Sequence, residues 1–570
     1  MLTGLSWVLP FLSPNFREPI ATFYGESAAF LLGLAALTVL YGRASWPAVQ
    51  LPRASLMFLG FAALILIQVL IGRFVFLQQN LLGILYLLWA VAMAALGWRL
   101  REIFGLERLV ATLAGFVVAG ALLSAVIGLA QWWGIPSPLQ PFMLAQLHGR
   151  IYANTGQPNH LADYICLGMA ALIFLGASAR LRLPTVAVAA IPLLIVLVVS
   201  GSRSAWLYLT AMLILGALFQ LLRPSGTALR IAWLSAALLA GFVAVQLLTV
   251  FAGDMPVTPI ESIGVRTHSE SLLPAIRLRL WHEAWLMLRA TPLLGQGFGQ
   301  FAWQHFLLNA QLPAPRLQDI GYDHAHNLVF QTGAEFGLAG LGVLACGCWV
   351  WARSMASREF SACMWWLLCA LAILGIHSML EYPLWYAYFL GIAAVLLGVS
   401  ETSAITIGGG TGSRLVPVLI LLLGWVAAAN TYRDYRTLQS LHGIQSRGAG
   451  AERRSATDVL LELRQHSLFT PFVELALARS IALNQERLED KLSVNDAAMH
   501  FAPNPDIVYR QAVLLALAGE QQAARAQWDR SVANYPASRP GVIAVLEAMA
   551  PSDAKAADLL NYAKAPRAGE

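Results

Sequence analysis

Charge is scarce in this sequence. Only 12% of its 570 residues are Asp, Glu, Lys or Arg, 58% are hydrophobic, and the mean hydropathy is +0.63. Soluble globular proteins carry about twice that charged fraction, which excludes an ordinary soluble domain for most of the chain. The apolar residues form continuous runs long enough to cross roughly 30 Å of hydrocarbon, and they do not alternate as membrane strands do. The predicted fold class is therefore an all-α polytopic membrane protein.

The apolar runs predict twelve or thirteen transmembrane helices. The first run is short and contains Pro10, so we expect only partial insertion. It has no basic segment before it and no small-residue cleavage site after it, so it is not expected to be a cleavable signal peptide. The predicted spans are residues 3–13, 27–41, 55–72, 80–98, 109–133, 161–178, 184–200, 204–222, 229–251, 327–351, 361–380, 385–399 and 415–430.

Lysine is absent before Lys491, so arginine alone sets the charge of the loops. Arginines are frequent in alternate connections and sparse in the others, which hold Arg17, Arg73 and Arg150. By the positive-inside rule the arginine-rich connections face the cytoplasm and the others the periplasm or exterior. The net charge of +6 then reflects membrane topology and not nucleic-acid binding. The predicted cytoplasmic arginines are Arg43, Arg53, Arg99, Arg101, Arg108, Arg180, Arg182, Arg223, Arg230, Arg353, Arg358 and Arg414.

Cysteine is also rare, with five residues that all fall within predicted spans. Such cysteines are expected to act as small hydrophobic side chains, without an external disulfide or a metal site. They are Cys166, Cys346, Cys348, Cys363 and Cys369.

The composition divides the chain into a transmembrane domain over residues 1–430 and a helical C-terminal domain over 431–570. A long polar loop, residues 252–326, interrupts the first domain on the periplasmic side. With thirteen crossings the C-terminal domain is also periplasmic. Its segment 505–536 fits either one tetratricopeptide-like repeat or a generic helical hairpin, since Ala512, Ala524, Trp528 and Pro536 occupy the repeat's small, aromatic and proline positions.

Residues 323–331 (Asp-His-Ala-His-Asn-Leu-Val-Phe-Gln) place two imidazoles and a carboxylate where this loop enters an apolar helix. Histidine is the side chain whose unperturbed pKa lets it act as a base near neutral pH. A proton acceptor at a membrane face suggests chemistry on a substrate that itself resides in the bilayer.

Five further polar segments map to the same predicted face of the membrane. They are residues 154–160 (Asn-Thr-Gly-Gln-Pro-Asn-His), 200–204 (Ser-Gly-Ser-Arg-Ser), 277–281 (Arg-Leu-Arg-Leu-Trp), the glycine-rich turn 291–299, and 381–383 (Glu-Tyr-Pro). Their convergence on one face is stronger evidence for a site than any single segment.

Each segment also has a structural interpretation. Gln157 to His160 could cap a helix, Arg203 could extend to the interface, and Tyr382 could belong to an aromatic belt. Arg277 could pack along Trp281, four residues later on the same helix face. The glycine turn lacks the lysine and the preceding strand of a phosphate loop, which argues against nucleotide binding.

Taken together, these motifs resemble the O-antigen ligase and polymerase superfamily. The resemblance rests on Arg-x-x-x-Trp at 277–281, Pro-x-x-Gly-x-Gly at 292–297, His-x-His-Asn at 324–327, and Glu-Phe-Gly at 335–337 followed by Gly340. Residues 156–162 (Gly-Gln-Pro-Asn-His-Leu-Ala), with Pro19 and 23–26 (Phe-Tyr-Gly-Glu), are similar to the PglL-type bacterial protein O-oligosaccharyltransferases. The similarity extends from the N-terminus to about residue 430, and a C-terminal extension fits that branch.

The resemblance implies transfer of an oligosaccharide from undecaprenyl diphosphate to an acceptor hydroxyl, in the bacterial inner membrane with the site facing the periplasm. It implies His326 as the general base, and Arg203 and Arg277 as groups that stabilise the departing diphosphate. Single displacement would invert the anomeric carbon. We expect no cofactor and no metal, since the external loops contain no Asp-x-Asp pair. The expected substrate-binding residues are Gln157, Asn159, His160, Tyr382 and His324.

Three functions remain at this stage. The first is transfer to serine or threonine of exported proteins such as pilins, which the Gln-Pro-Asn-His segment and the C-terminal extension favour. The second is ligation of O-antigen to lipid A-core, or glycan polymerisation, with the same donor. The third is transport, which would require charged or broken segments at mid-bilayer. The spans here are almost free of ionisable residues, with Asp163 and His377 as exceptions near helix ends.

Overall fold

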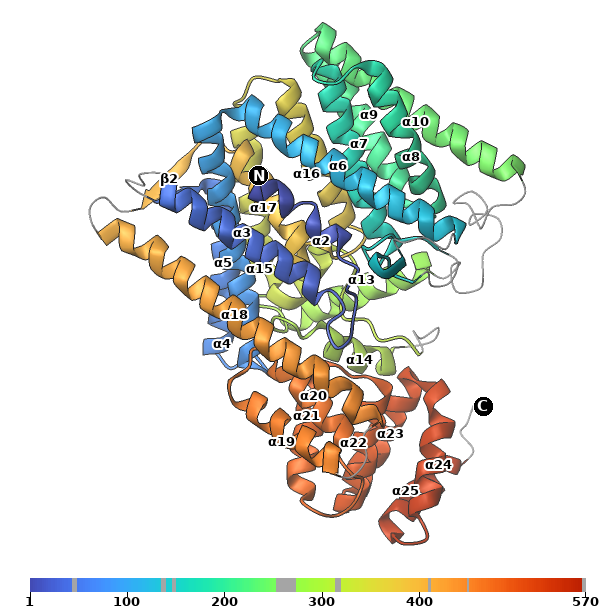
Figure 1. Ribbon diagram of the computed structural model, residues 1–570. Coiled ribbons are helices and arrows are strands. Elements are labelled where there is room, and N and C mark those ends of the chain that lie inside the picture. The colour runs from blue at the N-terminus through green and yellow to red at the C-terminus, as the bar shows by residue number, and fades with distance from the viewer. Residues whose placement is uncertain are drawn as a thin grey trace. The chain divides into compact units, whose positions relative to one another are not determined.

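A computed structural model describes residues 1–43, 49–134, 140–145, 150–252, 273–312, 319–407, 412–447 and 451–565 (Figure 1). In this part of the chain, eight helices are long and apolar enough to cross a membrane, and the predicted all-α membrane fold is confirmed. The eight are α3 (Phe23–Arg43), α4 (Leu56–Leu70) together with the 3-10 turn η1 (Arg53–Ser55) that precedes it, α5 (Leu77–Phe104), α6 (Leu106–Trp133), α7 (Pro158–Ala177), α9 (Ser204–Leu222), α10 (Gly226–Ala252) and α15 (Leu328–Ala356).

Four of the remaining predicted spans correspond to shorter apolar segments. They hold α1 (Leu2–Leu5) with α2 (Leu9–Leu12), α8 (Leu183–Val199), α16 (Ala362–Ser378) and α17 (Ala387–Ser400). The last predicted span, 415–430, lies within the long helix α18 (Gly412–Arg447). A short antiparallel pair, β1 (Val49–Pro52) with β2 (Ala404–Ile407), joins two connections that the sequence did not predict as strands.

The first predicted span, 3–13, is two short helices and not one. Proline lacks the N–H that a helix interior requires, but it is tolerated in a first turn, where that N–H has no partner within the helix. The chain accordingly leaves helix after Leu5, and α2 begins at Leu9 with Pro10 in its first turn.

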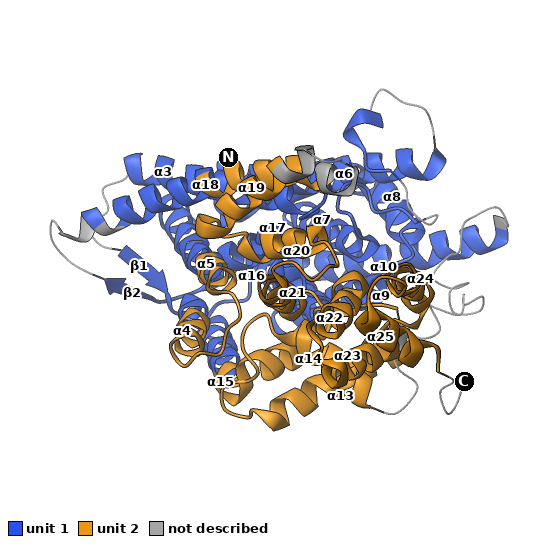
Figure 2. Cartoon of the chain, turned by 90° about the horizontal axis from the view of Figure 1, so that it is seen from below, with its two compact units in different colours: residues 1–60, 86–273, 343–429 blue, residues 61–85, 274–342, 430–570 orange. Residues whose placement is uncertain are grey.

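The chain forms two compact units that do not follow its linear order (Figure 2). Unit 1 contains residues 1–60, 86–273 and 343–429, and unit 2 contains 61–85, 274–342 and 430–570. Helices α4, α5, α15 and α18 therefore contribute one part to each unit. The described part of the long loop belongs to the same unit as the C-terminal helices.

In unit 1, α7 is the central helix and packs against α6, α8, α9, α10 and α16. Every residue from His160 to Ala177 is buried, as expected for a helix that is apolar all round. The approach to α6 is close, since a Cβ on Gly168 would lie 2.3 Å from that of Ala121. Bulkier residues here would push α6 and α7 apart.

At the end of unit 1 where the sequence predicts cytoplasmic arginines, Arg101 and Arg358 converge on one buried residue, Glu401. Both guanidinium groups donate to its carbonyl oxygen. Its carboxylate accepts from the backbone N–H of Ala54, 2.9 Å away. The two arginines, which are far apart in sequence, thus lie at the same end of unit 1, as the positive-inside assignment requires.

In unit 2, the glycine-rich turn that follows α13 (Leu273–Ala290) packs against a break in α15. The break is at Gly337, whose φ is +64°. Gly297 N–H donates to the carbonyl of Glu335 at 3.1 Å, and Leu338 N–H donates to that of Pro292 at 2.7 Å. The turn therefore uses its backbone groups to hold α15, which explains the glycines without a phosphate ligand.

In the C-terminal part of unit 2, each helix from α19 to α23 packs on the next, and α25 packs on α22, α23 and α24. The predicted hairpin over 505–536 is present: α22 and α23 pack together, and Ala512, Ala524 and Trp528 are fully buried. The helices are α19 (Ala451–His466), α20 (Thr470–Ser480), α21 (Leu488–Phe501), α22 (Pro505–Ala518), α23 (Gln521–Asn534), α24 (Arg539–Met549) and α25 (Ala554–Lys564).

Candidate functional site

Three of the predicted polar segments meet in unit 1 through the side chain of Asn159. Its Oδ1 accepts a hydrogen bond from Ser202 Oγ (2.8 Å), and its Nδ2 donates to Glu381 Oε1 (3.0 Å). Asn159 is on the first turn of α7, Ser202 precedes Arg203 in the α8–α9 turn, and Glu381 precedes Tyr382 in the α16–α17 turn. The structure therefore brings together segments that are 222 residues apart in sequence.

Gln157 occupies the N-cap position of α7, but its side chain makes no capping hydrogen bond. The turn is held instead by Thr155, whose hydroxyl donates to the carbonyls of Tyr152 (2.7 Å) and Gln157 (3.1 Å). Helix capping therefore does not account for the glutamine side chain, which is half-buried.

His160 lies inside the bundle and is only 3% exposed. Its ring packs against those of Tyr386 and His377, with centroids 4.9 and 5.4 Å away. His377 Nδ1 in turn lies 2.5 Å from Asp163 Oδ2, and both side chains are fully buried. Asp163 and His377, the two ionisable residues in otherwise apolar spans, are thus partners. Direct contact of His160 with substrate stays a prediction.

Tyr382 is the first of three stacked tyrosines. Its ring centroid is 5.8 Å from that of Tyr386, which is 5.6 Å from that of Tyr388, with interplanar angles of 27° and 18°. Tyr388 then meets Phe11 edge to face at 5.1 Å. The stack leads from the α16–α17 turn to the N-terminal segment.

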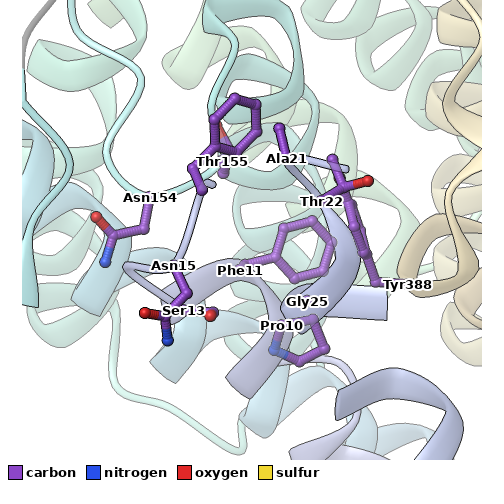
Figure 3. A pocket seen from close by; sticks show the side chains of 11 residues that line it. Pro10, Phe11, Ser13, Asn15, Ala21, Thr22, Gly25, Asn154, Thr155 and Tyr388 are labelled. Atoms are coloured by element: carbon purple, nitrogen blue, oxygen red, sulfur yellow. The ribbon is translucent and has the colours of Figure 1, made fainter. Parts of the chain in front are cut away.

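A small open pocket lies at the far end of this stack (Figure 3). Asn15 and Asn154 lie on one side of it and Tyr388 on the other. Polar and aromatic side chains share the lining, which comprises Pro10, Phe11, Ser13, Asn15, Phe16, Ala21, Thr22, Gly25, Asn154, Thr155 and Tyr388.

In unit 2, residues 319–327, the histidine loop, carry His324 and His326 and are held at Ala325, the residue between them. Ala325 is fully buried, and both of its backbone groups are bonded. Its N–H donates to Gln331 Oε1 on α15 (2.7 Å), and its carbonyl accepts from Trp281 Nε1 on α13 (3.1 Å). Helices α13 and α15 therefore fix the backbone between His324 and His326.

His326 has a φ of +51°, in the left-handed region that non-glycine residues rarely adopt. Such strain is maintained when the surroundings determine the backbone, and it is concentrated at functional sites. Its ring is half-buried and meets Tyr322 edge to face at 6.1 Å. The anchored Ala325 next to it provides the required restraint.

His324 Nδ1 lies 2.9 Å from Asp323 Oδ1, whose side chain is 68% exposed. The charge and hydrogen bond of His324 lower the pKa of the Asp323 carboxyl to about 2. Asp323 is therefore an anion at neutral pH. It pairs with His324, while the aromatic neighbour of His326 is Tyr322.

Arg277 is half-buried and lies one helical turn before Trp281 on α13, so the two side chains share a face. The stacking of Trp281 on Phe330, with centroids 5.3 Å apart, directs that face toward the start of α15. Arg203 is exposed and belongs to unit 1. A single pocket that contains Arg203, Arg277 and His326 stays a prediction.

No group of three or more His, Cys, Asp or Glu side chains is positioned to share a metal ion in the described ranges. All five cysteines, which lie in those ranges, are free thiols, three of them buried. The predicted metal independence stays a prediction for experiment.

Three features of these sites were not predicted from the sequence. The first is the bond between Glu381 and Asn159. The second is the pairing of Asp163 with His377, although two ionisable residues in otherwise apolar spans are a signal that each needs a partner. The third is the bond by which Trp281 holds the histidine loop, since only packing with Arg277 was expected of this residue.

Comparison with known proteins gives three family profiles that match consecutive parts of the chain. A profile described as protein glycosylation ligase matches residues 151–175, and one described as O-antigen ligase matches residues 188–345. One described as the C-terminal part of a virulence factor membrane-bound polymerase matches residues 365–546. The first two include the Gln157–His160 segment and the histidine loop.

Two curated relatives come from Acinetobacter baylyi (strain ATCC 33305 / BD413 / ADP1). A general O-oligosaccharyltransferase is 26% identical over 476 residues, which cover 81% of this chain and 80% of the relative. A ComP-specific O-oligosaccharyltransferase is 23% identical over 403 residues, which cover 69% of each protein. Together with the family profiles, they confirm the resemblance that the motifs indicate.

Proposed function

We propose that this oligosaccharyltransferase, which is of the PglL type within the O-antigen ligase superfamily, uses undecaprenyl diphosphate as the carrier of its donor glycan. The enzyme transfers the oligosaccharide from this carrier to serine or threonine hydroxyls of exported proteins. The observation that carries the proposal is the histidine loop, where Trp281 and Gln331 hold Ala325 and so fix His326 in a left-handed backbone conformation.

In this reaction His326 is the general base. The acceptor hydroxyl gives its proton to the imidazole while its oxygen forms a bond to the anomeric carbon of the first sugar. The bond between that carbon and the diphosphate oxygen breaks, and the electron pair leaves with undecaprenyl diphosphate. One such displacement inverts the anomeric carbon. A positioned general base contributes about 10²–10⁴-fold to the rate.

Negative charge grows on the diphosphate as this bond breaks, and Arg277 and Arg203 stabilise it. A guanidinium group stays charged and donates two parallel hydrogen bonds to phosphate oxygens, which an ammonium group cannot do. Arg277 is suited to the role because the same helix face carries Trp281, the anchor of the His326 loop. With arginines in this role, no divalent cation is required.

The glycan or acceptor is bound by the turns that Asn159 joins in unit 1. Gln157 and Tyr382 offer a primary amide and a phenol next to that junction. Tyr382 also opens the tyrosine stack, whose faces suit the C–H surfaces of a sugar. His160 and His324 complete the proposed set, His160 from within the bundle and His324 from the histidine loop.

The enzyme works in the bacterial inner membrane with this site toward the periplasm. The meeting of Arg101 and Arg358 at Glu401 supports this orientation, because the positive-inside rule assigns an arginine-rich end to the cytoplasm. The turns joined by Asn159 include the N-terminal end of α7 and the C-terminal end of α16. Exported acceptors and a flipped lipid-linked donor are both available on that side.

Ligation of O-antigen to lipid A-core, or glycan polymerisation, is the second candidate, since two of the matching profiles carry those descriptions. Co-expression with a glycan-assembly pathway and a pilin-like acceptor, in a host without its own ligase, separates them. Glycan on serine or threonine of the acceptor supports the first proposal. Glycan found only on lipid A-core, or only as longer glycan chains, supports the second.

A further inference from the structure

The C-terminal helices of unit 2 share a core with α14 (Phe301–Gln311), a helix of the long loop. Phe306 of α14 is 1% exposed and belongs to the same buried cluster as Trp528 and Tyr535. The ring of Trp303 also lies 4.2 Å, centroid to centroid, from that of His500 on α21. Thus α14 is packed as a member of the C-terminal helices, although more than a hundred residues separate them in sequence.

Asn534, the last residue of α23, makes the polar part of this contact. Its Nδ2 donates to the carbonyl of Phe306 (3.0 Å) and to that of Arg530 (2.9 Å). Its Oδ1 accepts from Nδ2 of Asn309 on α14 (2.8 Å). Asn309 is fully buried and Asn534 is 3% exposed, so neither amide can exchange these bonds for water at low cost.

The same end of α23 also holds the first described residue of the histidine loop. Asp319 N–H donates to the carbonyl of Asn534 (2.8 Å), and Ala537 N–H donates to Asp319 Oδ1 (3.0 Å). Asp319 has a φ of +58°, so it is a second non-glycine residue of this loop in the left-handed region. Such a conformation is maintained only where the surroundings determine it.

From α14 the contacts continue to His326, the proposed general base. His305 lies 2.6 Å from Glu283 on α13, and its ring meets Tyr322 edge to face at 5.7 Å. Tyr322 in turn meets the ring of His326. One side of α14 thus contacts the C-terminal helices through Phe306 and Asn309, while His305 contacts the histidine loop.

We propose that the C-terminal helices hold the histidine loop in its working conformation, and that Asn534 is a positioning residue for His326. The inference rests on the proposed function for the role of His326 as a base, but the contact itself does not depend on it. The C-terminal helices would then be required for the chemical step, in addition to any part they have in recruiting acceptors.

The test uses the full-length protein in detergent and compares Asn534→Ala with Asn495→Ala. Asn495 is the matched control, because it is a fully buried asparagine of the same helices that bonds to the carbonyl of Ile507 and to Gln511, with no bond to α14. Amide hydrogen exchange over residues 319–330 is measured, together with kcat and KM for glycan transfer.

Asn534→Ala is expected to speed amide hydrogen exchange over residues 319–330 and to lower kcat roughly 10- to 100-fold. KM for donor and acceptor should stay within about twofold, because a displaced base affects the chemical step and not ground-state binding. Asn495→Ala is expected to leave both readouts near wild type. The double variant Asn309→Ala/Asn534→Ala should be no worse than the worse single variant, since both amides act in one contact.

Unchanged exchange and kcat in Asn534→Ala would overturn the inference. An equal loss in Asn495→Ala, or a loss in Asn534→Ala confined to the KM of the acceptor, would also overturn it. If Asn534→Ala does not fold, Asn534→Asp serves, since it keeps the acceptor oxygen for Asn309 and loses both donations. A wild-type protein that transfers no glycan would refute the proposed function, while the exchange measurement would still decide the contact.

Discussion

The hydrogen bond from Trp281 to the carbonyl of Ala325 gives the sharpest prediction about the histidine loop. The substitution Trp281→Phe removes the indole N–H and keeps an aromatic ring for the stacking on Phe330. It leaves the buried carbonyl of Ala325 without its donor, which costs about 1–3 kcal/mol. The left-handed backbone of His326 costs about 1–2 kcal/mol, so the loss is as large as the strain that the anchor has to offset.

Since 1.4 kcal/mol is a factor of ten, we expect kcat for glycan transfer to fall by roughly 5- to 100-fold. KM for the lipid-linked donor should stay within about twofold, because the substitution changes the position of the base and not the donor-binding arginines. The assay follows a labelled lipid-linked oligosaccharide onto a purified acceptor protein, with the enzyme in detergent.

Trp285→Phe on the same helix is the matched control, because its side chain is 49% exposed and no hydrogen bond to the histidine loop is found for it. This variant should transfer glycan at the wild-type rate. If Trp281→Phe also kept the wild-type kcat, the argument that an anchored Ala325 positions His326 would be wrong.

Three further predictions concern the rest of the site. Asn159→Ala leaves the buried carboxylate of Glu381 without that donor and should cost about 1–3 kcal/mol, seen as a lower Tm in detergent; an unchanged Tm would argue against the junction. Asp163→Ala leaves His377 unpaired in the bundle and should destabilise the protein by about 3–5 kcal/mol, measured by thermal unfolding, where a shift no larger than that of a surface variant would count against it. Transfer should continue in EDTA, and activity that disappears with EDTA and returns with Mn²⁺ or Mg²⁺ would contradict the metal-independent mechanism.

Much of the fold could be predicted from the sequence because the bilayer imposes simple constraints on length and composition. Continuous apolar runs gave the helices, and their positions agree with the structure within a few residues for most spans. The exceptions have local causes. Pro10 divides the first run, and Gly337 breaks α15 where the glycine turn packs against it.

The site could be predicted only in part, because the sequence shows which polar residues share a membrane face but not which of them touch. The residues at 159, 202 and 381 were all in predicted polar segments, yet their mutual bonds depend on how α7, α9 and α16 pack. The contact of Asn534 with α14 had no signal in the sequence, since asparagine is common near the C-terminal end of a helix.

The most direct test of the whole account is transfer by purified enzyme in proteoliposomes that contain an undecaprenyl-diphosphate-linked oligosaccharide and an exported acceptor protein. Mass spectrometry of acceptor peptides is compared between the wild type and His326→Ala. We predict glycan on serine or threonine with the wild type, and a rate at least about 100-fold lower with a normally inserted His326→Ala protein. Equal rates for the two enzymes, or a wild type that leaves the acceptor peptides unmodified, would contradict it.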